Sequence, residues 1–180
     1  HRAPLGSTNL VPALSSLAAG FAGPADKPRT IVYIGDGITS GLDRDEFREL
    51  VEKLRARRVT VSSLAIGPRR DIEFMATIAN HTGGQIVVDA DGQSPEANGH
   101  ALAVGAQQSV MWPVAVKLPG AISDAYPQSF PPLRGDRDSI LVGKLAGDQN
   151  LKNQMLHVTF ERDGRRLDRS WNLTAEDASP

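Results

Sequence analysis

The first 110 residues alternate between stretches with a helical apolar stripe and short, wholly apolar runs. Apolar residues at helical spacing over residues 10–21 predict a first helix, with Thr8 or Asn9 as its N-cap. Residues 30–34 form a continuous β-branched and aromatic run. Such a run predicts a strand buried on both faces, as in a parallel sheet.

The same alternation continues through the rest of this part. A capping aspartate, Asp43, precedes the next predicted helix, whose apolar face ends near Leu54. The elements expected after it are a strand, a helix, a short strand and a more polar helix, at residues 59–66, 72–82, 86–88 and about 95–110. Alternation of strands and helices predicts an α/β fold, a doubly wound parallel sheet with helices on both faces.

The last 70 residues change to patterns typical of β structure. Alternating apolar and polar residues on either side of Asp163-Gly164 predict a hairpin over 155–161 and 166–173. Two further strands are expected over residues 114–118 and 139–145, and turn-forming residues fill 119–136. The chain is therefore predicted to consist of an α/β part, residues 1–110, and a small all-β sheet or half-sandwich, residues 111–180.

Composition narrows the classes of function. The 180 residues are 40% hydrophobic, enough for a core, and carry 20 basic against 21 acidic residues. Nucleic acids and anionic membranes select a basic excess, so neither is expected as a partner, and no apolar run approaches the roughly 20 residues that cross a bilayer. The absence of cysteine excludes disulfides, thiolate zinc sites and a cysteine nucleophile. A start at His1, without a signal peptide, indicates a processed or excised piece.

Two oxygen-bearing residues are predicted at one edge of the sheet. Asp36 lies in Gly35-Asp36-Gly37, directly after a predicted strand, and ligands of open α/β sheets gather at the carboxyl ends of strands. Thr8 lies at a predicted helix start. Separately, Asp36 could simply bend a loop and Thr8 could simply cap its helix. Together they offer hard oxygen ligands of the kind that Mg²⁺ prefers.

These segments resemble a known family. Gly6-Ser7-Thr8-Asn9-Leu10 resembles the Gly-x-Thr-x-Leu segment of von Willebrand factor A (VWA) domains, and Ile31 to Gly41 resembles their Asp-Gly strand end. Residues 59–67 and 78–84 resemble the strand and helix that follow. The resemblance implies a Rossmann-like VWA fold whose N-terminal strands are missing. It also implies a metal-ion-dependent adhesion site in which Thr8 is a ligand and Asp36 binds Mg²⁺ through water.

The resemblance extends further and also breaks down at one motif. Residues 127–145 resemble the segment after the A domain in inter-alpha-trypsin inhibitor heavy chains and related bacterial proteins. The family's Asp-x-Ser-x-Ser motif is absent, and its expected place lies before His1. Only Thr8 and Asp36 of the expected side-chain ligands remain, so the resemblance implies an incomplete site with weak affinity for Mg²⁺.

Three functions are compatible with these observations. The resemblance implies a non-enzymatic protein-binding or adhesion module, extracellular or in the cell envelope, whose partner contributes a carboxylate to the metal. The first alternative is a structural scaffold that works without metal. The second is an esterase, because Gly35 to Thr39 resembles the Gly-Asp-Ser-Ile-Thr start of a lipase and esterase family, although Gly37 replaces the nucleophilic serine.

Other polar and aromatic residues have ordinary structural interpretations. The histidines lack metal-ligand spacing, so His81, His100 and His157 are expected on the surface or in turns. Residues 89–92 read as a polar turn, and the arginines at 55, 57 and 58 as a solvated helix end. Trp112 and Trp171 are expected to anchor the core of the β part.

Overall fold

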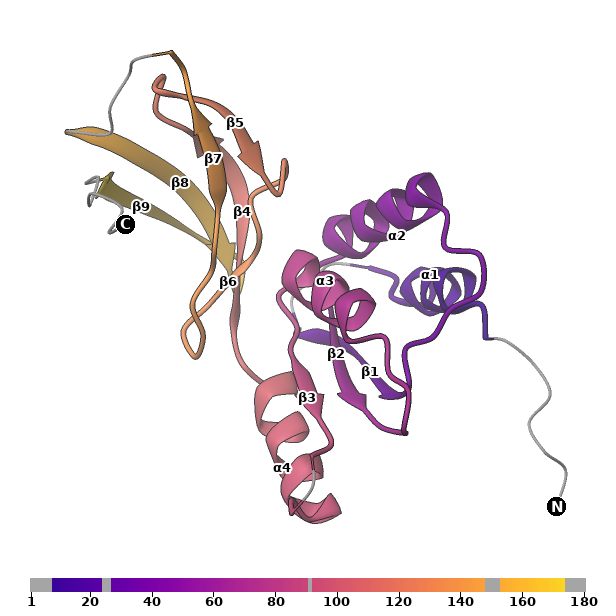
Figure 1. Cartoon of the computed structure of the whole chain (residues 1–180). Coiled ribbons are helices and arrows are strands. Elements are labelled where there is room, and N and C mark those ends of the chain that lie inside the picture. The colour runs from indigo at the N-terminus through magenta and orange to yellow at the C-terminus, as the bar shows by residue number, and fades with distance from the viewer. Residues whose placement is uncertain (1–7, 24–26, 91, 148–152, 174–180) are drawn as a thin grey trace, which may run out of the picture. The chain divides into compact units, whose positions relative to one another are not determined.

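The computed structural model describes residues 8–23, 27–90, 92–147 and 153–173 (Figure 1). The chain divides into two compact units, unit 1 (residues 1–108) and unit 2 (residues 109–180). Among the described residues, all four helices lie in unit 1, and unit 2 is built from strands. No helix of the described residues is long and apolar enough to span a membrane.

Unit 1 alternates helices and strands in the predicted order. The elements are α1 (Leu10–Gly20), β1 (Arg29–Gly35), α2 (Arg44–Ala56), β2 (Val59–Ala65), α3 (Ile72–Thr82), β3 (Ile86–Val88) and α4 (Pro95–Ala106). The strands form one parallel sheet in the order β1-β2-β3. The predicted α/β class with a parallel sheet is therefore confirmed.

Helices cover both faces of this sheet (Figure 1). Ile31, Val59 and Val61 join the residues of α1, α2 and α3 in one buried core cluster. On the opposite face, the Thr30 hydroxyl donates to the carbonyl of Ala106 at the end of α4 (3.2 Å). The two faces of the sheet thus alternate between residues that meet α1–α3 and residues that meet α4.

The prediction that β1 is buried on both faces is wrong. Val32 and Ile34 are 50% and 57% exposed, although both lie within the apolar run. Their strand is at the edge of the sheet, and α4 packs on β2 and β3 instead. A sequence run typical of a central strand therefore lies at an edge, with one face uncovered.

Arginines at the end of α2 bind carbonyl groups rather than forming only a solvated end. Arg57 donates from Nη1 to the carbonyls of Ala18 (3.1 Å), Ala19 (2.9 Å) and Phe21 (3.0 Å). These carbonyls lie at the C-terminal end of α1, the negative end of the helix dipole, so a cation there is favourable. The guanidinium of Arg57 thereby ties α1 to α2, which corrects the solvated interpretation.

His81 is another correction, because it is half-buried rather than a surface residue. Its ring packs against the ring of Phe47 with centroids 6.5 Å apart, and Arg55 donates to its backbone carbonyl (2.9 Å). Burial, with a smaller contribution from the charge of Arg55, lowers the pKa of His81 below its usual value. The folded state therefore favours the neutral imidazole.

The lowered pKa of His81 predicts a pH-dependent stability. Below the ordinary histidine pKa of about 6.5, the unfolded chain binds a proton that the folded chain does not. The free energy of unfolding should therefore fall as the pH falls from about 7 to 5. Urea titrations at several pH values would measure this slope, and His81→Gln should reduce it. An unchanged slope in His81→Gln would contradict the assignment.

Unit 2 consists of antiparallel sheets. Its strands are β4 (Val110–Lys117), β5 (Ile122–Tyr126), β6 (Leu133–Arg134), β7 (Val142–Leu145), β8 (Gln154–Arg162) and β9 (Arg165–Leu173). They form a four-stranded sheet in the order β6-β4-β8-β9 and a β5-β7 pair. The predicted hairpin is confirmed, since β8 and β9 pair around Asp163 and Gly164, both at positive φ.

Two strands of unit 2 were not predicted. β5 and β6 lie within residues 119–136, which the abundance of turn formers marked as irregular. β5 is held by pairing with β7, and β6 by pairing with the first residues of β4. β4 also begins at Val110, earlier than expected, and accommodates Pro113 at a register shift. Pairing across the sheet thus overrides local turn propensity.

The core of unit 2 centres on β8. Phe160 is fully buried, and Leu156 and Val158 lie on the same face of the strand. Trp112 is buried but does not belong to this core cluster, and Trp171 is 37% exposed and packs edge-on against Phe160 with ring centroids 6.2 Å apart.

Candidate functional site at the carboxyl edge of the parallel sheet

Asp36 follows β1 directly and is exposed at the carboxyl end of the sheet. Its Oδ1 accepts a hydrogen bond from the backbone N–H of Ile38 (3.0 Å), the pattern of an Asx turn. Its backbone carbonyl accepts from the N–H of Asp71 (2.7 Å), the N-cap of α3. The loop that presents Asp36 is therefore anchored to the start of a packed helix.

Thr8 is brought to the loop that begins at Asp36. It forms a parallel β-bridge with Thr39, and its carbonyl accepts from the N–H of Ser40 (3.3 Å). The Thr39 hydroxyl in turn accepts from the N–H of Leu10 (3.1 Å). Asn9, which occupies the N-cap position of α1, makes no side-chain cap. The predicted N-cap position is therefore confirmed at Asn9, but the side-chain hydrogen bond to the helix start comes from the Thr39 hydroxyl rather than from Thr8 or Asn9.

Further polar residues at this edge were missed by sequence reasoning. Asp89 follows β3, and its N–H donates to the carbonyl of Ala65 at the end of β2 (2.9 Å). Its carboxylate accepts from the Asn98 amide (2.8 Å), and the Arg70 guanidinium donates to its carbonyl. The sequence signal was the end of the short strand at Val88, which should have placed Asp89 at the same edge as Asp36.

The two predicted ligands are of a chemical type that Mg²⁺ accepts, but they do not complete a site. Thr8 and Asp36 are exposed oxygen-bearing side chains, the donor type that Mg²⁺ accepts. One oxygen of Asp36 is already bonded to the N–H of Ile38. Among the described residues, no three His, Asp or Glu side chains are grouped so that they could hold a metal ion. The described residues thus form no complete metal site, and binding of Mg²⁺ at Thr8 and Asp36 stays a prediction.

Gly37 has a structural reason to be glycine. Its φ is +73°, a region that other residues adopt with strain. A Cβ at this position would lie 2.8 Å from Cε of Met75 and 3.0 Å from the carbonyl of Asp71. A serine here would have a strained backbone and would require the Met75 side chain and the Asp71 carbonyl to give way. The esterase alternative, which needs a nucleophile at this position, receives no support from the geometry.

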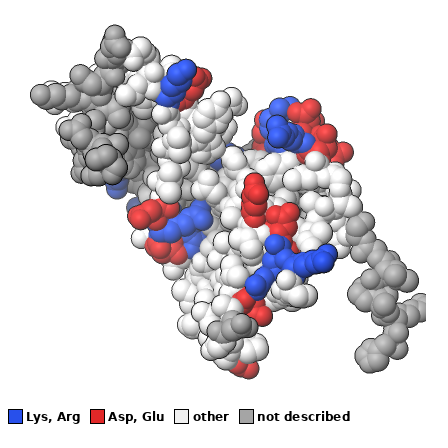
Figure 2. All heavy atoms as spheres, in the orientation of Figure 1, with Lys and Arg blue, Asp and Glu red and all other residues white. Residues whose placement is uncertain are grey.

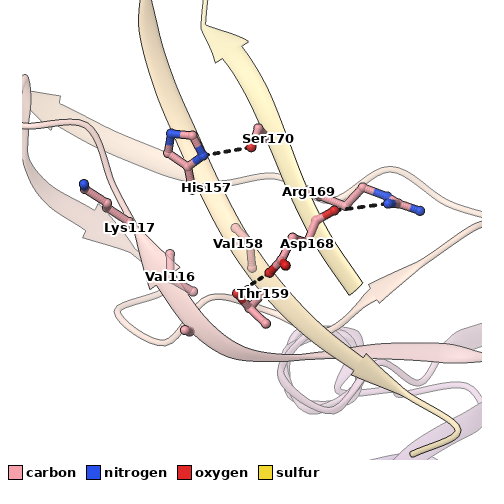
Figure 3. A pocket seen from close by; sticks show the side chains of 9 residues that line it. Val116, Lys117, His157, Val158, Thr159, Asp168, Arg169 and Ser170 are labelled. Carbon is pink, nitrogen blue, oxygen red and sulfur yellow. Dashed lines mark hydrogen bonds between the residues drawn. The ribbon is translucent and has the colours of Figure 1, made fainter. Parts of the chain in front are cut away.

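A second group of polar side chains lies in unit 2 and lines a shallow groove of about 240 Å³ on the β4-β8-β9 face (Figure 3). His157 Nδ1 and the Ser170 hydroxyl are hydrogen-bonded (2.8 Å), and the Thr159 hydroxyl donates to Asp168 (2.6 Å). The hairpin turn at 163–164 sets this register, so the pairs could have been read from the sequence.

This groove does not form a Ser-His-Asp relay. In such a relay one imidazole nitrogen faces the serine and the other is held by the carboxylate. Here the carboxylate of Asp168 is bonded to Thr159, and His157 is bonded to Ser170 across a different pair of the ladder. The groups lie on an exposed sheet face, where neighbouring strands ordinarily exchange such side-chain hydrogen bonds.

Charges of both signs are interspersed on the surface. Figure 2 shows basic and acidic side chains of the described residues side by side in small mixed groups, without an extended area of one sign on the face in view. This agrees with the formal net charge of −1.

Comparison with known proteins identifies the fold. The structure is similar to that of a von Willebrand factor type A protein from Catenulispora acidiphila, with a TM-score of 0.57 and 11% identity over 92% of this chain and 46% of the other. It is also similar to the human COPII-coat protein Sec24c, with a TM-score of 0.57 and 12% identity over 92% of this chain and 29% of the other. The chain thus spans less than half the length of both. No protein-family profile and no curated protein sequence matches it.

These similarities support the predicted fold but not the predicted relationship of residues 127–145. They support the VWA-type fold over most of the chain. Neither structure is an inter-alpha-trypsin inhibitor heavy chain, so the likeness of residues 127–145 to that group stays a prediction. The chain has a VWA-type α/β fold accompanied by antiparallel sheets.

Proposed function

We propose that this protein is a non-enzymatic protein-binding module of the VWA type that binds its partner at the carboxyl edge of the parallel sheet. The observation that carries the proposal is the pairing of Thr8 with Thr39, which brings Thr8 to the loop of the exposed Asp36. Loops on a rigid scaffold are common binding surfaces, and this loop is fixed to α3 through Asp71.

The proposal includes weak binding of Mg²⁺, with Thr8 and Asp36 as two of its oxygen ligands. When bound, the cation would offer a coordination position to an acidic side chain of the partner. Asp36 would contribute through its carboxylate while its Asx turn to Ile38 keeps the loop in place. The partner expected from this chemistry is a protein that presents an exposed carboxylate.

A metal-independent scaffold is the second candidate function. It is favoured by the lack, among the described residues, of any three His, Asp or Glu side chains grouped to hold a metal ion. It is also favoured by the use of Asp36 Oδ1 within its own loop. As a metal-independent scaffold, the protein would bind a partner at the carboxyl edge of the parallel sheet through hydrogen bonds and shape complementarity alone.

Isothermal titration of Mg²⁺ into the wild type and Asp36→Asn should separate the two functions. Asparagine keeps the oxygen that accepts from Ile38 but removes the charge, so the loop should persist while Mg²⁺ affinity falls at least tenfold, about 1.4 kcal/mol. The matched control is Asp138→Asn, an exposed aspartate in unit 2 that should leave affinity unchanged.

Two results would contradict the metal version. Absence of Mg²⁺ binding to the wild type would favour the scaffold, and equal binding by Asp36→Asn would remove Asp36 from the site. Turnover of short-chain esters by the wild type would contradict the non-enzymatic assignment.

A further inference from the structure

Tyr33 reaches from β1 to the loop that presents Asp36. Ile31, Tyr33 and Gly35 lie on the same side of the strand, because successive residues alternate between the two faces of a sheet. Ile31 is buried in the core of unit 1, and Tyr33 packs against that core. The ring of Tyr33 extends over Gly35, and its hydroxyl accepts a hydrogen bond from the N–H of Gly37 (3.1 Å). A side chain of the strand thus binds the backbone of the Asp36 loop directly.

Gly35 leaves the space that the Tyr33 ring occupies. A Cβ on Gly35 would lie 2.3 Å from the hydroxyl oxygen of Tyr33 and 2.7 Å from the ring carbon that bears this oxygen. Both distances are well below van der Waals contact, so a side chain at position 35 would push the ring aside. The first glycine of Gly35-Asp36-Gly37 is therefore matched to the tyrosine two residues before it.

The hydrogen bond from Gly37 to Tyr33 is difficult to replace. Gly37 is buried, so water has little access to its N–H. A buried backbone N–H that loses its acceptor costs as much free energy as a lost hydrogen bond or more. Without the Tyr33 hydroxyl, the loop would have to rearrange in order to satisfy this N–H elsewhere.

The residues on either side of Gly37 are held by other bonds of the loop. The carbonyl of Asp36 accepts from the N–H of Asp71, and its carboxylate accepts from the N–H of Ile38. Both of these bonds involve Asp36 itself. The bond to the Tyr33 hydroxyl is different, because a substitution in the strand can remove it and leave the chemistry of Asp36 intact.

We propose that Tyr33 is a positioning residue for Asp36. The Tyr33 hydroxyl fixes Gly37, and Gly37 links the two residues of the Asx turn, Asp36 and Ile38. The Asp36 carboxylate is therefore held in one orientation before a ligand binds, which reduces the conformational entropy lost on binding. The inference rests on the proposed function of the Asp36 loop, and it applies whether the loop binds its partner with or without Mg²⁺.

Tyr33→Phe tests the inference, because phenylalanine keeps the ring over Gly35 and removes the hydroxyl. NMR of the full chain without ligand would measure the hydrogen-exchange rate of the Gly37 N–H and the three-bond Hα–Hβ couplings of Asp36, which report its rotamer. In Tyr33→Phe the exchange should be roughly tenfold faster, the scale of one lost hydrogen bond. The couplings should change from those of one rotamer to averaged values.

Two controls separate a local effect from general loosening of the protein. Tyr126→Phe removes the hydroxyl of the other tyrosine, which is 59% exposed on β5 of unit 2, and should change neither measurement. The N–H of Ser63 donates to the carbonyl of Gln85 (2.8 Å) in the same sheet as Tyr33 and should keep its exchange rate in Tyr33→Phe. Equal acceleration at Ser63 and Gly37 would overturn the inference, because Tyr33 would then support the whole unit.

Titration with Mg²⁺ distinguishes this inference from the proposed function. If the wild type binds Mg²⁺, Tyr33→Phe should weaken binding roughly threefold, and it should have no further effect in Asp36→Asn, because Tyr33 acts through Asp36. A wild type that binds no Mg²⁺ would contradict the metal-dependent function, while the NMR measurements would still decide the role of Tyr33. Unchanged couplings of Asp36 in Tyr33→Phe would overturn the inference in either case.

Discussion

Gly84→Ala should destabilise unit 1 by about 3 kcal/mol or more, a large effect for one methyl group. A Cβ on Gly84 would lie 1.8 Å from the carbonyl oxygen of Val61 and 2.4 Å from its carbonyl carbon. Both are backbone atoms of β2, the central strand of the sheet, and cannot rotate away. The chain must shift, and the hydrogen bond from the N–H of Val61 to Thr82 (3.1 Å) would be strained with it.

Denaturant unfolding followed by circular dichroism at 222 nm measures this effect, because all helices of the described residues lie in unit 1. The matched control is Gly99→Ala, within α4, where nothing lies within 4 Å of the added Cβ. That substitution should leave stability equal or raise it by up to about 1 kcal/mol, since alanine favours helix. Equal stability of Gly84→Ala and the wild type would contradict the predicted clash.

The sequence predicted what Gly83-Gly84 does locally but not what it does in the packed unit. The helix predicted over residues 72–82 ends at this pair, where Gly83 adopts a φ of +73° at the C-cap of α3. The close approach of Gly84 to Val61 depends on how α3 lies against β2. Contacts between residues distant in the chain leave no local pattern, so this constraint could not be read from the sequence.

The same difference explains the result for β1. Its apolar run predicted a strand of a parallel sheet, which is confirmed, because composition and period report the strand itself. Whether each face is covered depends on the neighbouring elements. The pattern could not indicate that α4 would pack on β2 and β3 and leave Val32 and Ile34 exposed.

For the candidate site, the sequence predicted where Asp36 and Thr8 lie better than it predicted which hydrogen bonds form around them. Asp36 lies at the carboxyl end of β1, and Thr8 joins its loop, because both follow from element order. The sequence did not predict that the Thr39 hydroxyl accepts from the N–H of Leu10 at the start of α1. It also did not predict that Asp89 lies at the same edge of the sheet. Side-chain partners depend on loop conformation, which sequence period does not report. Binding of Mg²⁺ stays a prediction.

In unit 2, local signals predicted better than long-range ones. The β8-β9 hairpin was predicted because Asp163-Gly164 supports positive φ at both turn positions. β5 and β6 were missed because their stability comes from pairing with β7 and β4, residues well separated along the chain. Turn propensity describes only the residues themselves.

Phe160→Ala should destabilise unit 2 by about 3–5 kcal/mol, the range for removing a large buried aromatic side chain. Phe160 is fully buried, and its ring makes edge-on contacts with Phe130 and Trp171, both with centroids 6.2 Å apart. Alanine would leave a cavity between these rings and remove both aromatic contacts. Met155→Ala is the control in the same strand, because Met155 is 40% exposed, and it should cost less than about 1 kcal/mol.

Tryptophan fluorescence and circular dichroism at 222 nm would follow the unfolding of Phe160→Ala, and together they test whether the two units unfold separately. Both tryptophans, Trp112 and Trp171, lie in unit 2, whereas the helices of the described residues lie in unit 1. The residues that pack around Phe160 all belong to unit 2. Phe160→Ala should therefore move the fluorescence transition to lower denaturant while the transition at 222 nm holds its midpoint. A joint shift of both transitions would contradict this expectation, because it would mean that the two units unfold as one cooperative body.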